Sequence, residues 1–276
     1  MTLILSCATQ EYVVQVSDRR LVSPPDGQLH DDDTNKAVVF CGRMVFAYTG
    51  LAELEGKRAD EWLTKVLSDP SCRSLSDAVN TIRTRATETF QEIPLSAESK
   101  RHTFVGIGWT KNSLEEPFRP IICAISNFED EQGNISSRAR DEFTNSIFIL
   151  QESDTFAFLS TGQQLPAHLA TDLVRNVRRC VKKQCGPQPI TRLLAIGIRK
   201  VAVDNKNVGD NLLAVSFPKS AIGSPDFLMV SGPPLIDVPS FLYIPAHQTD
   251  EIEYGPNVAC RGWGMTEFRI TPAGRR

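Results

Sequence analysis

The sequence predicts an α+β protein in which antiparallel β-sheets are layered with helices. The order along the chain is strands, two helices, strands, two helices and a final strand. Helices grouped in pairs between hairpins argue against the alternation that builds a parallel sheet. No period of 20 to 50 residues recurs, which excludes solenoids and propellers. The 276 residues suffice for one large domain or two small ones.

The first fifty residues predict two pairs of strands. Short β-rich runs fall at residues 3–7, 12–17, 36–41 and 43–48. Polar residues at 9–11 separate the first two runs, and Gly42 separates the last two, as in hairpins. A Pro-Pro-Asp-Gly loop at 24–27 and an acidic run at 31–33 lie between the pairs.

Beyond Gly50 the apolar residues recur at helical spacing in four segments. The four stripes are Leu54, Trp62, Leu63, Val66 and Leu67; Leu75, Ala78, Val79, Ile82, Ala86 and Phe90; Leu165, Leu169, Leu173, Val177 and Val181; and Ile190, Leu193, Leu194, Ile198 and Val201. Ser74 or Ser76 is suited to cap the second helix, and Pro189 suits the first turn of the fourth.

Further strands are expected between and after these helices. They fall at residues 103–109, 120–126, 146–150, 155–159 and 211–217, with a polar loop at 129–145. Eight of the seventeen prolines lie from Pro218 onward. We therefore expect a main domain over residues 1–218 and a proline-rich C-terminal extension over 219–276, packed on the body.

Composition excludes several classes of partner. Thirty Lys and Arg against thirty-three Asp and Glu leave a net charge of −3, so no basic excess predicts nucleic-acid binding. No stretch approaches the roughly 20 apolar residues of a membrane span, and the start does not resemble a signal peptide. The seven scattered cysteines suit reduced thiols. We expect a cytoplasmic protein that binds neither nucleic acid nor membrane.

Common cofactor motifs are missing from the sequence. The four histidines form no metal-binding pair, and Cys180 and Cys185 do not have zinc spacing. The acidic run at 31–33 lacks an EF-hand pattern and is expected to be a solvated loop. No phosphate-binding loop, dinucleotide fingerprint or nucleophile elbow occurs. We expect no metal and no cofactor.

Thr2 is the one residue that suggests a nucleophile. Thr is small enough for the preceding Met1 to be removed, which would place a hydroxyl and a free α-amine on one residue. Such an amine has a pKa of about 7.7–8.0 and can act as general base for its own hydroxyl. A nearby cation would lower the pKa of the amine. By itself, however, a Met-Thr start is common.

The spacing after Thr2 adds to this interpretation. Asp18 follows sixteen residues later, Lys36 eighteen after that, and Gly50 a further fourteen. This pattern resembles the catalytic subunits of the proteasome and its bacterial relatives, which are N-terminal-nucleophile (Ntn) hydrolases. The first and last intervals match that family, and the middle one is two residues longer. Residues 158–162 and 203–209 resemble later family segments more weakly, so the resemblance spans about residues 2–218.

The resemblance implies a four-layer αββα sandwich and a set of catalytic roles. Thr2 would supply the nucleophile and the base. Lys36 would depress the pKa of the amine, and Asp18 would orient Lys36. The backbone N–H of Gly50 would stabilise the oxyanion, and Asp204 would support the terminus.

The resemblance also implies a substrate pocket lined by Val38, Tyr48 and Ala52, which the bulk of Tyr48 would narrow. Two positions depart from the family, because Gln163 and Asn207 stand where the family usually has serines that position the amine. Both side chains can still form hydrogen bonds.

The leading hypothesis is a threonine-type Ntn hydrolase that cleaves amide bonds, in particular peptide bonds, through an acyl-enzyme on Thr2. One alternative is a catalytically inactive proteasome-like scaffold or binding protein, and another is a small-molecule amidase. Taken one at a time, these residues also suit ordinary structural roles. Asp18 could form an ion pair in a turn, Lys36 could be a charge at a strand edge, and Gly50 could form a turn. Together with Thr2 at this spacing they indicate a site. By family analogy we expect a homo-oligomer.

Overall fold

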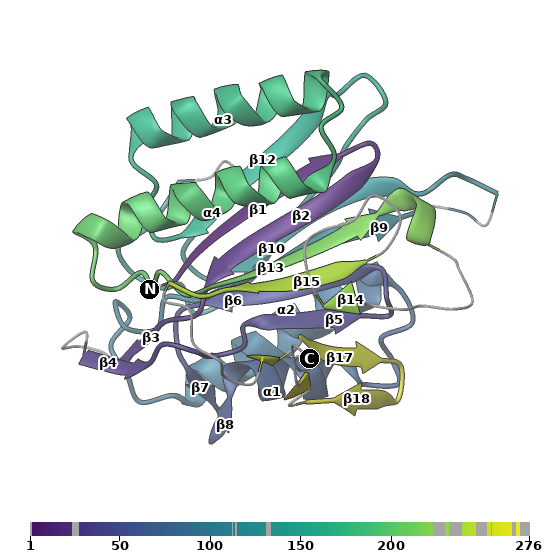
Figure 1. The fold of residues 1–276 in the computed structure, drawn as a ribbon. Helices are drawn as coiled ribbons and strands as arrows, with labels where there is room; N and C mark the ends of the chain where they lie inside the picture. Colours follow the sequence, from purple (N-terminus) through teal and green to yellow (C-terminus); the bar gives the residue numbers. More distant parts are fainter. Residues whose placement is uncertain are drawn as a thin grey trace.

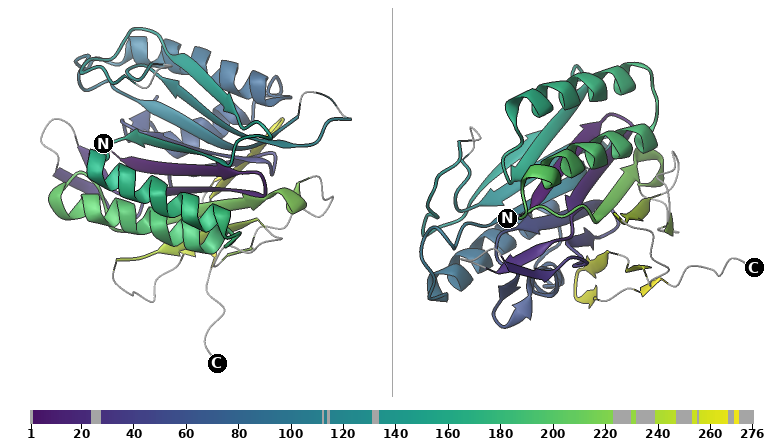
Figure 2. Two further views of the ribbon diagram at one scale, coloured as in Figure 1. Left: turned by 90° about the horizontal axis from the view of Figure 1, so that it is seen from above. Right: turned by 60° about the vertical axis from the view of Figure 1, so that its left-hand side comes forward.

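The chain folds into four layers, with two facing β-sheets between two pairs of helices (Figures 1 and 2). This computed structural model describes residues 2–23, 28–111, 113, 115–130, 134–222, 230–231, 239–246, 253–254, 256–266 and 269–270. The predicted α+β class and the αββα layering are confirmed. No helix in these residues is long and apolar enough to cross a membrane.

The first sheet has the strand order β12-β1-β2-β13-β15-β14. Its strands are β1 (Leu3–Thr9), β2 (Tyr12–Asp18), β12 (Phe156–Gly162), β13 (Leu212–Pro218), β14 (Val230–Ser231) and β15 (Ser240–Ile244). Neighbours are antiparallel apart from β14 and β15. In register, Leu3 lies opposite Gly162 and Ile4 opposite Ser17. The first hairpin predicted from the sequence is therefore at the centre of the sheet.

The second sheet has the order β11-β10-β9-β6-β5-β17-β18. Its strands are β5 (Ala37–Phe40), β6 (Met44–Thr49), β9 (Thr103–Thr110), β10 (Arg119–Ser126), β11 (Thr144–Ile149), β17 (Asn257–Cys260) and β18 (Trp263–Met265). All neighbours are antiparallel except β5 and β17. Three small ribbons complete the strands: β3 (Leu21–Ser23) with β4 (Gln28–Asp31), β7 (Glu53–Leu54) with β8 (Lys57–Arg58), and β16 (Glu253–Tyr254) with β19 (Arg269–Ile270).

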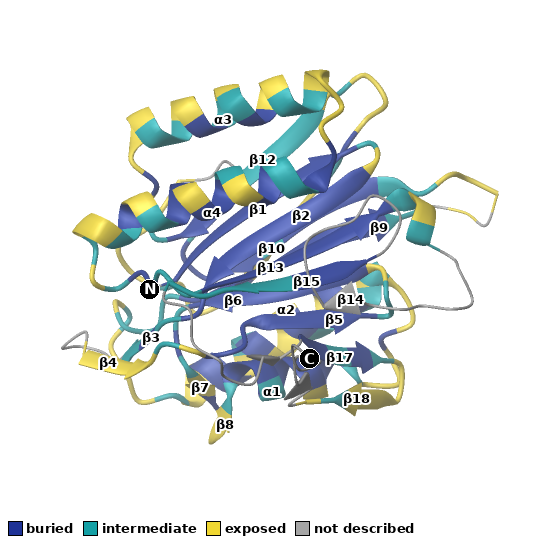
Figure 3. Ribbon diagram, viewed as in Figure 1, coloured by how far each residue is buried: buried dark blue, intermediate teal, exposed yellow. Residues whose placement is uncertain are grey.

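Each sheet carries one pair of helices on its outer face. The helices are α1 (Ala59–Leu67), α2 (Leu75–Glu92), α3 (Ala167–Lys182) and α4 (Pro187–Asp204), with a short 3₁₀ turn at Lys219–Ala221. Helices α1 and α2 lie on the second sheet, and α3 and α4 on the first. Their outward faces are exposed, whereas most strands beneath them are buried and β12, under α3, is partly buried (Figure 3).

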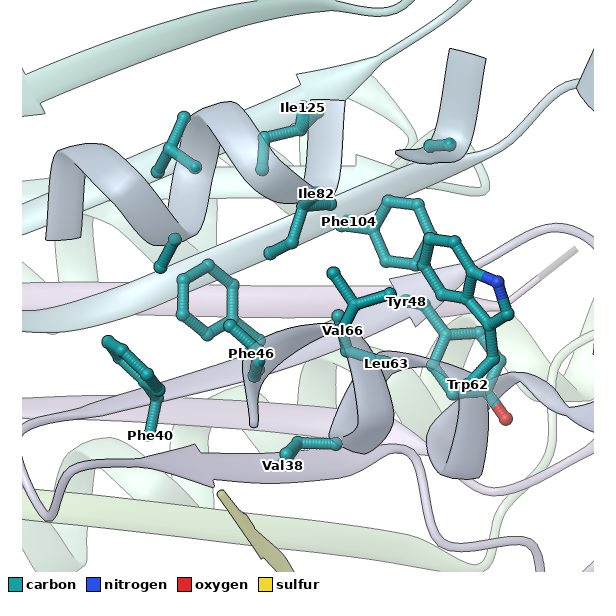
Figure 4. Packing of buried hydrophobic residues seen from close by; sticks show 14 of the residues in the cluster. Val38, Phe40, Phe46, Tyr48, Trp62, Leu63, Val66, Ile82, Phe104 and Ile125 are labelled. Atoms are coloured by element: carbon teal, nitrogen blue, oxygen red, sulfur yellow. The ribbon is translucent and has the colours of Figure 1, made fainter. Parts of the chain in front are cut away.

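Three apolar clusters separate the four layers. Trp62, Phe46 and Phe104 belong to the cluster between α1, α2 and the second sheet (Figure 4). A second cluster lies under α3 and α4, and a third, which includes Ile4 and Val45, fills the space between the sheets. Strands β1, β2 and β13 are therefore buried on both faces, which explains their nearly continuous apolar sequences.

The start of the first helix differs from the prediction. Leu54 fits the helical stripe but lies in β7, and α1 begins at Ala59. Glu55 and Gly56 form the turn between β7 and β8, with φ angles of 52° and 70°. Two consecutive positive φ angles are typical of a tight hairpin turn, and this turn interrupts the chain before the helix.

Residues beyond 218 extend both sheets. Strand β15 pairs with β13 in the first sheet, and β17 pairs in parallel with β5 in the second. Asn257, at the start of β17, accepts a hydrogen bond from the side chain of Asn35 at 3.4 Å and donates one to Asp60 at 2.8 Å. The end of the proline-rich extension, residues 271–276, lies outside the described residues.

Helix α2 begins with a capping box that tests one sequence prediction. Ser74 is the N-cap: its hydroxyl accepts the backbone N–H of Asp77 at 3.2 Å, and its own N–H donates to the Asp77 carboxylate at 3.0 Å. We expect Ser74→Ala to lower the free energy of unfolding by about 1 kcal/mol. Ser76→Ala, inside the helix, is the matched control and should not destabilise, because Ala favours helix. Urea unfolding of both variants checks this, and equal effects would contradict the assignment of the cap.

Candidate functional site

The backbone of Thr2 is held where the ends of the two sheets meet. Its carbonyl oxygen accepts the N–H of Gln163 at 2.9 Å and the hydroxyl of Thr49 at 3.1 Å. The same Thr49 hydroxyl accepts the N–H of Thr2 at 3.2 Å. Thr2 precedes β1 of the first sheet and Thr49 ends β6 of the second. Contacts from both sheets therefore fix Thr2, which is only 4% exposed.

The Thr2 side chain contacts Lys36. The Lys36 Nζ lies 2.5 Å from the Thr2 hydroxyl oxygen and 3.3 Å from Asp18 Oδ1, and it also donates to the carbonyl of Arg20 at 2.5 Å. Lys36 and Asp18 are both fully buried. Lys36 directly precedes β5 and Asp18 ends β2. Three of the predicted site residues, Thr2, Asp18 and Lys36, are thus brought together.

Backbone amides hold the Asp18 carboxylate. The N–H of Leu3 donates to Asp18 Oδ2 at 2.6 Å, and the N–H of Arg20 donates to Oδ1 at 3.0 Å. Burial raises the pKa of Asp18, while Lys36 and the amides of Leu3, Arg20 and Gly209 oppose the rise. Burial lowers the pKa of Lys36, and Asp18 opposes this. The loss of hydration on burial is offset because Lys36 and Asp18 carry opposite charges and the amides donate hydrogen bonds to the carboxylate.

Gly50 follows β6 in a conformation that suits only glycine. Its φ is 123°, and a Cβ placed there would lie 2.5 Å from the carbonyl oxygen of Arg101 and 2.6 Å from Nδ1 of His102. The next N–H, that of Leu51, donates to the same His102 nitrogen at 3.1 Å. This packing fixes the backbone at the position where an oxyanion hole is expected.

Two residues near Thr2 were not singled out as site residues from the sequence. Thr49 bonds both backbone polar groups of Thr2. Gly162 has a φ of 89°, and a Cβ there would lie 2.1 Å from the Thr2 carbonyl oxygen. Gly162 belongs to a segment that the resemblance covers, whereas for Thr49 the only sequence signal is its place beside Gly50.

Asp204 is not brought to this cluster. It is the exposed last residue of α4, and among the described residues its side chain forms no hydrogen bond to Thr2. The turn after α4 contributes Gly209 instead, whose backbone amide lowers the pKa of Asp18. In the same turn, Asn207 Oδ1 is buried without a hydrogen-bond partner among the described residues.

The three residues expected to line a pocket occupy different places. Val38 and Tyr48 lie in the core cluster under α1 and α2, where Tyr48 stacks on His102 with ring centroids 5.9 Å apart (Figure 4). Ala52 lines a groove of about 560 Å³ together with Leu51, His30 and other residues. The groove thus begins directly after Gly50, and of the three residues only Ala52 lines it.

Metal ligands are not gathered in the described part of the chain, since no group of three or more His, Cys, Asp or Glu side chains is arranged to hold an ion there. All seven cysteines are free thiols. Around Thr2, a hydroxyl, an ammonium and a carboxylate are in contact, and backbone amides point at the carboxylate.

Comparisons with known proteins give distant similarities of structure. No protein-family profile and no curated protein sequence matches the chain. A solved structure of an Anbu (Gly-1) mutant from Hyphomicrobium sp. strain MC1 is 13% identical, with a TM-score of 0.49, over 79% of this chain and 82% of that one. Anbu (ancestral beta-subunit) from Yersinia bercovieri is 11% identical, with a TM-score of 0.47, over 78% and 81%. At these values the αββα assignment rests on the topology described above.

Proposed function

We propose that this chain is a threonine-type Ntn hydrolase that cleaves amide bonds, in particular peptide bonds, with Thr2 as its N-terminal residue after removal of Met1. The observation that carries the proposal is the buried contact of Lys36 with both Thr2 and Asp18, at 2.5 Å and 3.3 Å. A hydroxyl, a cation and a carboxylate in this order are what such a nucleophile requires.

In the proposed reaction, the free amine of Thr2 takes the proton from the Thr2 hydroxyl as Oγ attacks the substrate carbonyl carbon. The positive charge of Lys36 disfavours protonation of the amine, so the base is available near neutral pH. The Gly50 N–H stabilises the negative oxygen of the tetrahedral intermediate. The C–N bond then breaks and the leaving amine takes up the proton. Water hydrolyses the resulting ester and restores Thr2.

A proteasome-like scaffold without catalysis is the second candidate. It is favoured by Gln163 and Asn207, which stand at positions where the resembled family has serines, and by the low exposure of Thr2. A small-molecule amidase would use the same machinery as the peptidase. Self-assembly belongs to the proposal because it rests on the same resemblance, and a cytoplasmic location belongs to it on the basis of the seven scattered cysteines.

Covalent labelling tests the nucleophile. We expect an epoxyketone or β-lactone probe to add one equivalent to the native protein at Thr2, with intact mass showing a chain that lacks Met1. Thr2→Ala should abolish the adduct. Thr171→Ala, on the exposed face of α3, is the matched control and should label normally. Chains that all retain Met1 and take up no probe would favour the scaffold.

Lys36 provides a test that separates chemistry from folding. Lys36→Met removes the cation and leaves Asp18 buried without its charge partner, so we expect a stability loss of about 3–5 kcal/mol and a labelling rate lower by roughly a hundredfold or more. The double variant Lys36→Met with Asp18→Asn removes both charges. It should recover much of the stability, measured by urea unfolding, without recovering the labelling rate. Recovery of both would show that Lys36 acts only through stability.

A further inference from the structure

A carboxyl group outside the proposed machinery contacts the end of β12, which lies against Thr2. Glu129 follows β10, and its Oε1 accepts the backbone N–H of Gly162 at 3.2 Å. Glu129 also lines a cavity of about 120 Å³ between the two sheets, together with Ser126 and Ser160. Its side chain thus bonds the end of β12, the strand at the edge of the first sheet.

The bonded glycine lies directly against Thr2. Gly162 pairs with Leu3, and a Cβ on Gly162 would lie 2.1 Å from the Thr2 carbonyl oxygen. The next residue, Gln163, donates its N–H to that oxygen at 2.9 Å. The chain of contacts therefore runs from Glu129 to the Thr161–Gly162 peptide, then through Gly162 to the N–H of Gln163 and on to Thr2. A shift of Gly162 would move the carbonyl anchor of Thr2.

Glu129 can change its charge in the neutral range. Burial raises the pKa of Glu129 to about 7, and the hydrogen bond from Gly162 opposes the rise. Asp130 lines the same cavity and accepts two hydrogen bonds from Asn134. The Arg140 guanidinium faces this region but donates to the main-chain carbonyl of Glu129 at 2.5 Å. Among the described residues that line the cavity, Glu129 and Asp130 are the ionisable ones.

We propose that Glu129 is a positioning residue for Thr2: its ionised carboxylate holds the N–H of Gly162, and with it the adjoining Gln163 that anchors Thr2, and its protonation loosens this hold. A charged acceptor forms a stronger hydrogen bond than a neutral one. The reactivity of Thr2 therefore follows the protonation state of Glu129. This last step rests on the proposed function, whereas the coupling of Glu129 to Gln163 does not.

The isosteric variant Glu129→Gln keeps an acceptor for Gly162 but carries no charge at any pH. Burial favours the protonated form of the wild-type Glu129 in the folded state. The stability that this protonated form contributes is fully present below the unfolded pKa of about 4.3 and is lost as pH rises through about 7. We therefore expect the melting temperature of Glu129→Gln to exceed that of the wild type above pH 7. Glu152→Gln, at an exposed loop residue, is the matched control and should show no such difference.

Nuclear magnetic resonance of ¹⁵N-labelled protein tests the coupling without requiring activity. In the wild type and in Glu152→Gln, the amides of Gly162 and Gln163 should shift together with a midpoint near pH 7. In Glu129→Gln, this step should be absent. A wild-type Gln163 amide that does not titrate, or one that titrates equally in Glu129→Gln, overturns the proposal.

Labelling rates across pH 5.5–9 test the consequence for Thr2. The ratio of the wild-type rate to the Glu129→Gln rate should rise through about pH 7 to a plateau of about fivefold, since titration of the amine itself cancels in the ratio. A ratio independent of pH overturns the control of reactivity. A wild type that never labels overturns the proposed function instead, and the Gln163 amide still decides whether Glu129 positions the Thr2 anchor.

Discussion

The buried ion pair of Lys36 and Asp18 is the constraint on which the rest of the site depends. Neither side chain is exposed, and removing two charges from water costs several kcal/mol for each ion. Main-chain groups offset this cost: the amides of Leu3 and Arg20 bond Asp18, and the carbonyl of Arg20 accepts from Lys36. The pair forms where the ends of β2 and β5 meet, and the Leu3 amide adds a contact from β1, so the charges favour one alignment of the two sheets.

This alignment gives the candidate site contributions from both sheets. Thr2 and Asp18 come from the first sheet, and Lys36 and Thr49 from the second. The apolar cluster between the sheets fixes their separation, because close-packed cores resist sliding. The site is thus set on strands and does not depend on a long loop for its geometry, which suits a function that needs atoms held within a fraction of an ångström.

The sequence predicted what depends on local pattern. Helical periodicity located the four helices of the described residues. The family resemblance carried by the spacing of Thr2, Asp18 and Lys36 implied a cluster that the structure brings together. Contacts that depend on register between distant strands were not visible. The only sequence signal for Thr49 is its place beside Gly50. Glu129 opens a segment that the sequence predicts as a polar loop, although burial raises the pKa of its carboxyl.

The parallel strand β17 has a consequence for the order in which the chain is made. Asn257 bonds Asn35, the neighbour of Lys36, across 222 residues of sequence. A polypeptide is synthesised from its N-terminus. Thr2, Asp18 and Lys36 are therefore synthesised long before β17, whose Asn257 bonds the neighbour of Lys36. The surroundings of Lys36 are therefore completed only after Asn257 has been synthesised, and a chain that stops short of this residue lacks the amide that joins Asn35 to Asp60.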